Sequence, residues 1–301
     1  MNSEVLTVLL VGFGGPERLE QVPAFVESVL GRTPPGHVVD SVTERYRAIG
    51  GGSPLPTTTR GQAALVNDEL RRRGVAADVH VGMLHAPPTI QDTVDLIESR
   101  GVEDLIVISL APYRCEVSTD AYEATVRQAV SPGGPRLHFA PDWNLAGGYV
   151  AALADMLAEA LVEAPRGTEV IFSAHSLPQR MIENGDPYAE QLRATAGQVA
   201  ATLGLAGWHL AYQSVSAAAR EPWLGPSVDE AMERAAAAGI KSVMIDPIGF
   251  ISDHVETLFD NDIEHRAHAI QLGLEFHRCR CLNHHAGLIG ALADVVMETA
   301  P

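Results

Sequence analysis

The sequence predicts an α/β protein built from two Rossmann-like halves, each with a parallel sheet, and a cleft between them. Short apolar runs alternate with longer amphipathic stretches along the whole chain of 301 residues. Most of these runs are followed by Gly, Pro or Ser, as strands are when they enter a loop. Repeated alternation of strand and helix favours parallel sheets that are covered by helices on both faces.

Each element is placed by its own apolar pattern. The predicted strands are Leu6–Val11, Asp78–Met83, Leu105–Leu110, Glu169–Ser173, His209–Gln213 and Ser242–Ile245. The predicted helices are Leu19–Leu30, Thr59–Arg73, Ile90–Ser99, Thr119–Val130, Tyr149–Glu163, Pro187–Leu203, Ser227–Ala238 and His284–Glu298. A division near 141–148 gives an N-terminal half at 1–145 and a C-terminal half at 146–301. A cleft between two such halves is the expected ligand site.

The composition excludes several classes of protein. The net charge of −17, from 38 acidic and 21 basic residues, repels nucleic acid and anionic lipid. No apolar stretch approaches the ~18 residues of a membrane-spanning helix, and the N-terminal run lacks the flanks of a signal peptide. We therefore expect a cytoplasmic monomer with no nucleic-acid binding and no integral membrane association.

The segment at 245–265 combines a predicted strand end with a row of acidic residues. Glu256, Asp260 and Glu264 recur every four residues, so an α-helix would place their carboxylates on one face. Such a row is either a solvated acidic face or a site for a divalent metal. Its position after a strand favours the metal, because open α/β sheets bind ligands at the carboxyl ends of their strands.

A second loop at a predicted strand end contains His175, in the motif SAHSLP at 173–178. A single histidine is often a structural residue that is held by hydrogen bonds. Here Glu256 follows another strand of the same half, so both side chains can face one crevice. An imidazole that faces a carboxylate suits either a proton-transfer pair or a metal-binding pair.

Two glycine-rich loops do not match nucleotide-binding motifs. VGFGGPE at 11–17 lacks the third glycine of a dinucleotide fingerprint, and RYRAIGGGSPL at 45–55 has no Lys-Ser/Thr after its glycines. The second loop instead offers flexible backbone, two guanidinium groups and a hydroxyl. Such a set would hold the carboxylates of a ligand.

Several motifs taken together resemble the ferrochelatase family through essentially the whole chain. They are RYRAIGGGSPL, SAHSLP, GDPY at 185–188, PWLGP at 222–226 and PIGFISDHVETLFDNDIE at 247–264. GMLHAPPTIQDTV at 82–94 and LAPY at 110–113 resemble the compact bacterial branch, which includes coproporphyrin ferrochelatases. The resemblance implies a lyase of haem and porphyrin biosynthesis that inserts Fe²⁺ into a porphyrin. It favours coproporphyrin III over protoporphyrin IX as the substrate and implies no organic cofactor.

The resemblance also implies roles for individual residues. His175 matches the catalytic histidine and Glu256 the glutamate that faces it, and both are candidate metal ligands. Asp260 and Glu264 match an acidic line that family members use for a metal path or a second divalent ion. Ser53 and Tyr122 match positions that contact the porphyrin, and Arg45 and Tyr46 lie near them in the motifs. Two further candidate porphyrin-binding residues come from their own positions: His85 follows another predicted strand and can line the cleft, and Phe13 offers an apolar wall for a flat ligand.

The chain departs from the compact branch at two places. Phe13 stands where part of that branch has a tyrosine that can ligate the product iron, so we expect no axial tyrosinate. Val29 and Leu30 stand where that branch has basic residues, so the porphyrin propionates must be anchored differently.

The three cysteines leave one cofactor question open. Some bacterial relatives hold a 2Fe-2S cluster with four cysteines, and Cys115, Cys279 and Cys281 could form such a site if a histidine completed it. Ordinary reduced thiols are the favoured interpretation, because the Cys-x-Cys pair lies on an expected strand, where alternate residues pack.

Two further functions stay open at this point. A related tetrapyrrole chelatase would load Co²⁺ or Ni²⁺, and metal preference depends on geometry that no motif reports. A non-catalytic haem- or porphyrin-binding carrier on the same scaffold would not need a base that faces an acid. The pair of His175 and Glu256 therefore argues against the carrier.

Overall fold

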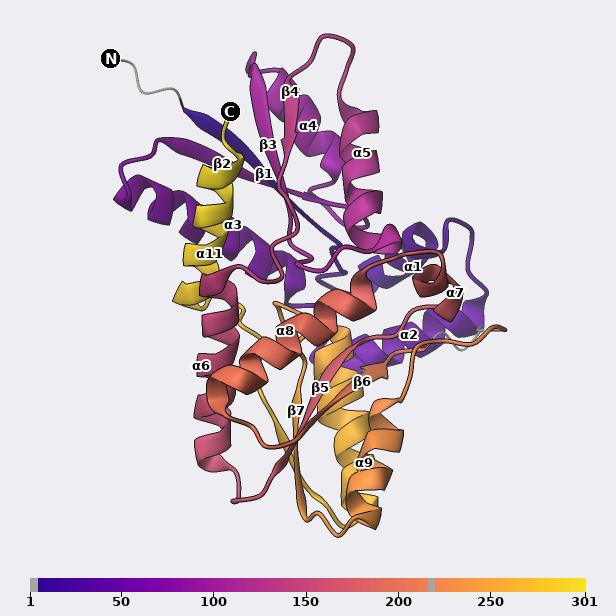
Figure 1. The fold of residues 1–301 in the computed structure, drawn as a ribbon. Helices are drawn as coiled ribbons and strands as arrows, with labels where there is room; N and C mark the ends of the chain where they lie inside the picture. Colours follow the sequence, from indigo (N-terminus) through magenta and orange to yellow (C-terminus); the bar gives the residue numbers. More distant parts are fainter. Residues whose placement is uncertain (1–4, 216–219) are drawn as a thin grey trace. The chain divides into compact units, whose positions relative to one another are not determined.

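The computed structural model describes residues 5–215 and 220–301 and contains two four-stranded sheets (Figure 1). The first has the order β2-β1-β3-β4, with β1 (Leu6–Gly12), β2 (Ala77–Met83), β3 (Asp104–Ser109) and β4 (Arg136–Phe139). The second has the order β6-β5-β7-β8, with β5 (Glu169–His175), β6 (Trp208–Gln213), β7 (Ser242–Asp246) and β8 (Glu275–Arg278). All neighbouring strands pair in parallel, which confirms the predicted α/β class.

Helices connect the strands of both sheets. Those of the first part are the 3-10 helix η1 (Leu19–Gln21), α1 (Val22–Leu30), α2 (Gly36–Ala48), α3 (Leu55–Arg72), α4 (Ile90–Glu98), the π-helix η2 (Glu116–Asp120) and α5 (Ala121–Ala129). The later ones are α6 (Gly147–Glu163), α7 (Gln179–Glu183), α8 (Tyr188–Leu203), α9 (Val228–Ala237), the π-helix η3 (Glu256–His265), α10 (Arg266–Gln271) and α11 (Ala286–Thr299).

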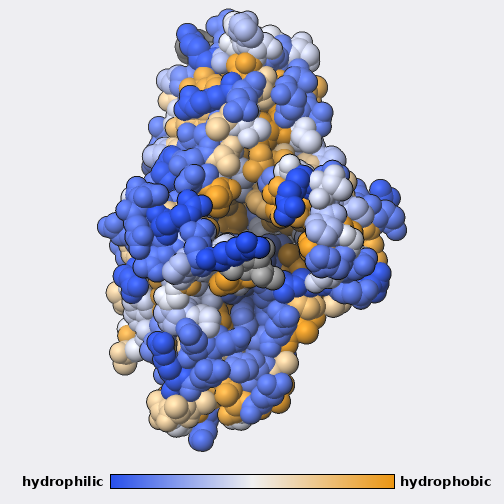
Figure 2. All heavy atoms as spheres, turned by 90° about the vertical axis from the view of Figure 1, so that its right-hand side faces the viewer, coloured by the Kyte–Doolittle hydropathy of each residue, from blue (hydrophilic) through white to orange (hydrophobic). Residues whose placement is uncertain are grey.

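Among the described residues, no helix is both long enough and apolar enough to cross a membrane. The face of the molecule in Figure 2 is mostly hydrophilic, with smaller hydrophobic areas between the polar ones. Over the whole sequence, acidic residues outnumber basic ones by 38 to 21.

The chain forms two compact units, and the second is inserted into the first. Residues 1–143 and 283–301 make up the first unit, and residues 144–282 the second. The division at residue 145 expected from the sequence placed residues 283–301 in the second half. In the structure these residues, which include α11, belong to the first unit. The Gln62 amide of α3 donates to the backbone oxygen of Asn283, 2.7 Å away, and Arg73 pairs with Asp294 of α11.

Each sheet is centred on strands that are buried on both faces. In the first unit Leu9 and Val107 belong to one buried cluster with residues of α4 and α5. In the second unit Ile171 and Val243 belong to a cluster with residues of α9. Continuous apolar runs are typical of strands buried on both faces, which is why all four central strands, β1, β3, β5 and β7, were predicted. The edge strands β2 and β6 were predicted as well.

The edge strands β4 and β8 were not predicted. Each has four residues, with the sequences RLHF and EFHR, and polar side chains interrupt the apolar pattern. β8 ends at Arg278, so Cys279 and Cys281 follow the strand and do not lie on it. The prediction that these two cysteines lie on a strand was therefore wrong.

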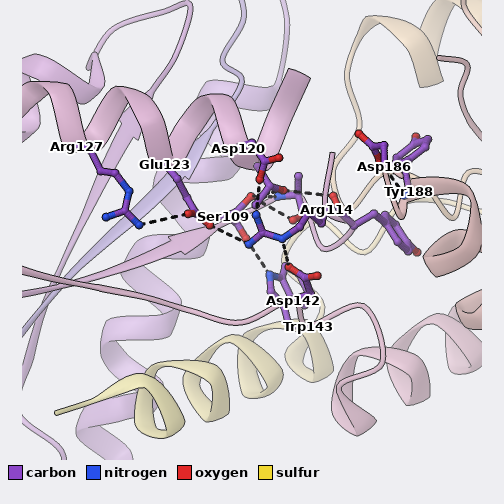
Figure 3. Close-up of polar contacts among 12 residues, drawn as sticks. Ser109, Arg114, Asp120, Glu123, Arg127, Asp142, Trp143, Asp186 and Tyr188 are labelled. Atoms are coloured by element: carbon purple, nitrogen blue, oxygen red, sulfur yellow. Dashed lines mark hydrogen bonds and ion pairs between the residues drawn. The ribbon is translucent and has the colours of Figure 1, made fainter. Parts of the chain in front are cut away.

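An ionic network holds the loop that follows β3 (Figure 3). Arg114 contacts Asp142 at 2.8 Å and Glu123 at 3.0 Å, and it also pairs with Asp120. Burial lowers the pKa of the Arg114 guanidinium, but hydrogen bonds to Glu123 and Asp142 outweigh burial and raise it. The network ties this loop to η2, to α5 and to the segment after β4.

Candidate active site

His175 is the last residue of β5 and is positioned through its own backbone. The hydroxyl of Tyr188 donates to the carbonyl oxygen of His175 at 3.2 Å. The carboxylate of Asp186 accepts from the backbone N–H of Tyr188 at 3.0 Å (Figure 3). The GDPY motif, to which no structural role was assigned from the sequence, therefore supports the strand end that carries the histidine.

A close backbone approach brings the segment after β7 to the end of β5. The N–H of Gly249 donates to the carbonyl oxygen of Ser173 at 3.1 Å. A Cβ atom at Gly249 would lie 2.6 Å from the Cβ of Ala174, closer than real contacts allow. Only glycine fits here, so the PIGF motif serves to pack the chain that leads to η3 against the residue before His175.

Glu256 is the first residue of η3 and faces the imidazole of His175. The Nδ1 atom of His175 lies 2.9 Å from Oε2 of Glu256, and the two side chains are 34% and 26% exposed. The side-chain amide of Gln213 donates to the backbone oxygen of Glu256 at 2.8 Å. His254, which was not predicted as a site residue, places Nε2 4.0 Å from the same carboxylate oxygen.

The paired groups change one another's ionisation. Burial raises the pKa of Glu256, but attraction to His175 and a hydrogen bond with it outweigh burial and lower that pKa to about 2. Burial lowers the pKa of His175, but the charge of Glu256 outweighs burial and raises it. Burial lowers the pKa of His254, which favours its neutral form. The pairing therefore favours the protonated form of His175 and the ionised form of Glu256, and burial favours the neutral form of His254.

The acidic row lies on a π-helix, not on the α-helix that the four-residue spacing suggested. At its end the N–H of Arg266 bonds to the carbonyl oxygen of Asn261, five residues earlier. Asp260 is only 3% exposed, whereas Glu264 is exposed. Across the described residues, 5–215 and 220–301, no three His, Cys, Asp or Glu side chains are grouped to hold a metal ion. The row thus differs in environment from one end to the other.

Ser214 is a site residue that the sequence did not reveal. Its hydroxyl donates to Oδ2 of Asp260 at 2.5 Å, and a hydrogen bond from it also lowers the pKa of Glu256. Its backbone has φ = +62°, in the left-handed region that residues other than glycine rarely adopt. The only sequence signal was its position directly after a predicted strand.

Three of the predicted porphyrin-binding residues meet in an aromatic cluster of the first unit, which consists of Phe13, Phe25, Tyr46 and His85. The ring centroids of Phe13 and His85 are 4.6 Å apart, and those of Phe25 and Tyr46 are 6.3 Å apart. Phe25 links the two pairs, with its centroid 6.2 Å from that of Phe13. The sequence had placed Phe25 only on a helix.

The other predicted porphyrin-binding residues lie in different surroundings. Arg45 lies near the end of α2, so this part of the expected flexible loop is helical. Ser53 is buried, and its N–H donates to the carbonyl oxygen of Pro16 at 2.7 Å. Tyr122 is 3% exposed within the core of the first sheet, where burial raises the pKa of its hydroxyl. The structure does not bring Tyr122 into the aromatic cluster.

Cys115, Cys279 and Cys281 are buried and form no disulfide within the described residues. Burial, with a smaller contribution from the charge of Asp246, raises the pKa of the Cys279 thiol. Burial also raises the pKa of Cys281. Both shifts favour the neutral thiol over the thiolate that binds a metal.

Comparison with known proteins gives a consistent result. The sequence model of the family described as ferrochelatase matches residues 6–300. A protein of Deinococcus radiodurans named ferrochelatase is 39% identical over 308 residues, which cover 99% of this chain and 97% of that protein. A coproporphyrin III ferrochelatase of Halalkalibacterium halodurans is 32% identical, with 99% and 98% covered.

A solved structure shares the fold at low sequence identity. SirB from Bacillus subtilis with Fe³⁺ aligns with a TM-score of 0.63 and 15% identity, over 99% of this chain and 96% of that one. At this identity the likeness concerns the fold alone. The match of the family model over nearly the whole chain, together with relatives above 30% identity, shows that the chain belongs to the ferrochelatase family.

Proposed function

We propose that the chain is a lyase that inserts Fe²⁺ into a porphyrin in haem biosynthesis, with coproporphyrin III as the favoured substrate. The observation that carries the proposal is the contact of 2.9 Å between His175 and Glu256 at the carboxyl edge of the second sheet. Relatives of nearly equal length are named ferrochelatase and coproporphyrin III ferrochelatase, which supports the same reaction here.

The reaction requires an exchange of protons for a dication. Two pyrrole N–H bonds break, both protons leave, and four porphyrin nitrogens bind Fe²⁺. Glu256 has a lowered pKa and is ionised, and its charge raises the pKa of His175; the neutral form of His175 is the one that can accept a proton or bind iron. We assign metal binding and first proton acceptance to His175, and onward transfer of protons to Glu256.

Asp260 and Glu264 extend this assignment away from the pair. Asp260 raises the pKa of His175 through its charge, and Glu264 is exposed further along η3. Carboxylates along one helix attract a divalent cation and can carry protons in the opposite direction. We therefore assign the metal path to Asp260 and Glu264.

The choice of porphyrin depends on the first unit. Phe13 is 37% exposed and gives a flat macrocycle an apolar surface. Val29 and Leu30 are 41% and 42% exposed on α1, so these two positions offer no charge to a propionate. Coproporphyrin III carries four propionates and protoporphyrin IX two, so the first unit must distinguish a charged macrocycle edge from an apolar one.

The direct test is anaerobic insertion of Fe²⁺ into coproporphyrin III and protoporphyrin IX side by side, followed by absorption spectroscopy. We expect turnover with both porphyrins and a higher kcat/KM for coproporphyrin III. Parallel assays with Co²⁺ and Ni²⁺ measure metal preference. Tight binding of porphyrin without insertion of any metal would contradict the proposal and favour a carrier.

A further inference from the structure

The imidazole of His85 has one nitrogen engaged and one available. Nδ1 lies 2.9 Å from the hydroxyl oxygen of Ser28, on α1. Within residues 5–215 and 220–301, Nε2 forms no hydrogen bond. It is not one of the fully buried side-chain atoms that lack a partner in that part of the chain, so it is at least partly exposed. The second nitrogen therefore reaches solvent.

The ring is fixed in place by its neighbours. The backbone N–H of His85 donates to the carbonyl oxygen of Phe13 at 3.0 Å. The rings of Phe13 and Phe25 both meet the imidazole edge-on, with interplanar angles of 65° and 88°. An imidazole held by a backbone bond, two aromatic contacts and a hydroxyl keeps one orientation, as a metal ligand requires.

The state of the imidazole suits a transition metal. Burial lowers the pKa of His85, so its neutral form prevails at neutral pH. When Nδ1–H donates to the Ser28 hydroxyl, Nε2 keeps its lone pair. Metal-binding histidines commonly donate their second N–H in this way, and a neutral imidazole is a common axial ligand of haem iron.

The surroundings of the ring point to the same ligand. Phe13, in contact with His85, is partly exposed and has only carbon atoms in its side chain, so it can lie against a macrocycle but cannot coordinate iron. Iron in a porphyrin has four nitrogens in the ring plane and retains axial positions for further ligands.

We propose that Nε2 of His85 is an axial ligand of the iron in the porphyrin product. The inference rests on the proposed function, because it needs an iron porphyrin as the bound species. An Fe–N bond forms, an axial water leaves, and no proton or electron is transferred. Coordination at this position would hold the product in the first unit after insertion.

The test uses the full chain and ferric coproporphyrin, which is the air-oxidised form of the ferrous product. We expect the wild-type complex to show the absorption and electron paramagnetic resonance signature of an imidazole-ligated ferric porphyrin. His85→Ala should lose that signature, and added imidazole should restore it. His85→Met should change the spectrum in a different way, because a thioether replaces the nitrogen; it also provides a second variant if the alanine variant folds poorly.

His138→Ala is the matched control. His138 belongs to the same unit and pairs with Asp104 of β3 at 2.7 Å. Asp104 keeps its contact with Arg136 when the imidazole is removed. We expect the spectrum of this variant to equal that of the wild type.

The outcomes separate the two proposals. If the spectrum of His85→Ala equals that of the wild type, His85 is not an axial ligand. This conclusion holds even if the variant binds the porphyrin more weakly, because a contact between His85 and the edge of the porphyrin would explain weaker binding without an Fe–N bond. Such a result leaves the insertion assay untouched. Failure of the wild type to insert any metal overturns the proposed function, whatever the spectra show.

Discussion

The two sheets have the same strand order but carry different chemistry at their carboxyl edges. After the ends of β1 and β2 the first unit presents the rings of Phe13 and His85 in a T-shaped contact. At the end of β5 the second unit presents His175 against Glu256. The same strand order thus ends in an aromatic pair in one unit and in a hydrogen-bonded pair of histidine and glutamate in the other.

The two units also treat buried charge differently. In the first, Arg114 is surrounded by three carboxylates, which compensate its burial. In the second, Asp246 ends β7 with one carboxylate oxygen fully buried and without a hydrogen-bond partner in the described residues. The equivalent strand of the first sheet, β3, ends in the uncharged Ser109. Removing one partner of a compensated buried charge is costly, whereas a buried ionisable group without a partner makes stability depend on pH.

The largest expected effect comes from removing the charged pair. His175→Ala should lower the rate of Fe²⁺ insertion by about 10²–10⁴-fold, as is typical when a proton-transferring group is lost. Porphyrin binding, measured by fluorescence quenching, should change little. The control is His209→Ala, because His209 pairs with Glu169 at 3.0 Å on the same sheet, near the amino ends of its strands. Normal turnover by His175→Ala would show that the pair is structural.

The next effect concerns Asp246. Burial raises its pKa from 3.8 to about 7. The folded chain therefore binds this proton more tightly than the unfolded chain, and the associated stability is complete below about pH 4 and lost as pH rises through about 7. Three pKa units correspond to about 4 kcal/mol. Asp246→Asn should lose this pH dependence in urea unfolding between pH 5 and 9, and a parallel pH profile in both proteins would contradict the pKa shift.

A control for this variant is Asp68→Asn, since the Asp68 side chain is 67% exposed. It should leave the difference in unfolding free energy between pH 5 and pH 9 unchanged.

A smaller effect is expected in the first unit. Arg114→Met should lower the unfolding free energy by about 2 kcal/mol, because it leaves three carboxylates without their common partner. Partial exposure of the guanidinium, 31%, limits the loss. Arg100→Met removes an exposed pair with Asp78 and should cost about 0.5 kcal/mol. Equal losses in chemical denaturation would mean that the network adds nothing beyond a surface pair.

The smallest effect concerns Ser214. Ser214→Ala removes the hydroxyl but keeps the positive φ, and it should lower turnover by about tenfold, because a hydrogen bond to a carboxylate is worth about 1.5–3 kcal/mol. Ser214→Gly also removes the hydroxyl but relieves the backbone, which should raise the unfolding free energy by about 0.5–1 kcal/mol relative to Ser214→Ala. Identical stabilities for the two variants would show that the backbone carries no strain.

The sequence predicted the parts of the molecule that repeat or are apolar. β1, β3, β5 and β7 are continuous apolar runs because both faces are buried. His175 and Glu256 could be paired in advance because both follow such runs, and parallel strands collect their carboxyl ends at one edge. The short polar edge strands and α2, with its glycine and valines, gave no comparable periodicity.

The rest depends on backbone geometry that side-chain patterns do not encode. A positive φ at Ser214 and the π-helical turns of η3 are products of tertiary packing. Tyr122 shows that a sequence match does not determine a side chain's surroundings. Its position matched a porphyrin-contacting position of the family, yet its ring packs in the core with residues of α4. A motif places a residue in the chain, and packing decides which way its side chain faces.

The return of α11 to the first unit has a consequence for biogenesis. Leu288, Leu292 and Val296 are fully buried there, so the first unit lacks part of its core until α11 has left the ribosome. The whole second unit is translated before then. A domain usually begins to fold as it emerges, N-terminal part first. In this chain we expect the inserted unit to complete its folding before the unit that surrounds it in sequence.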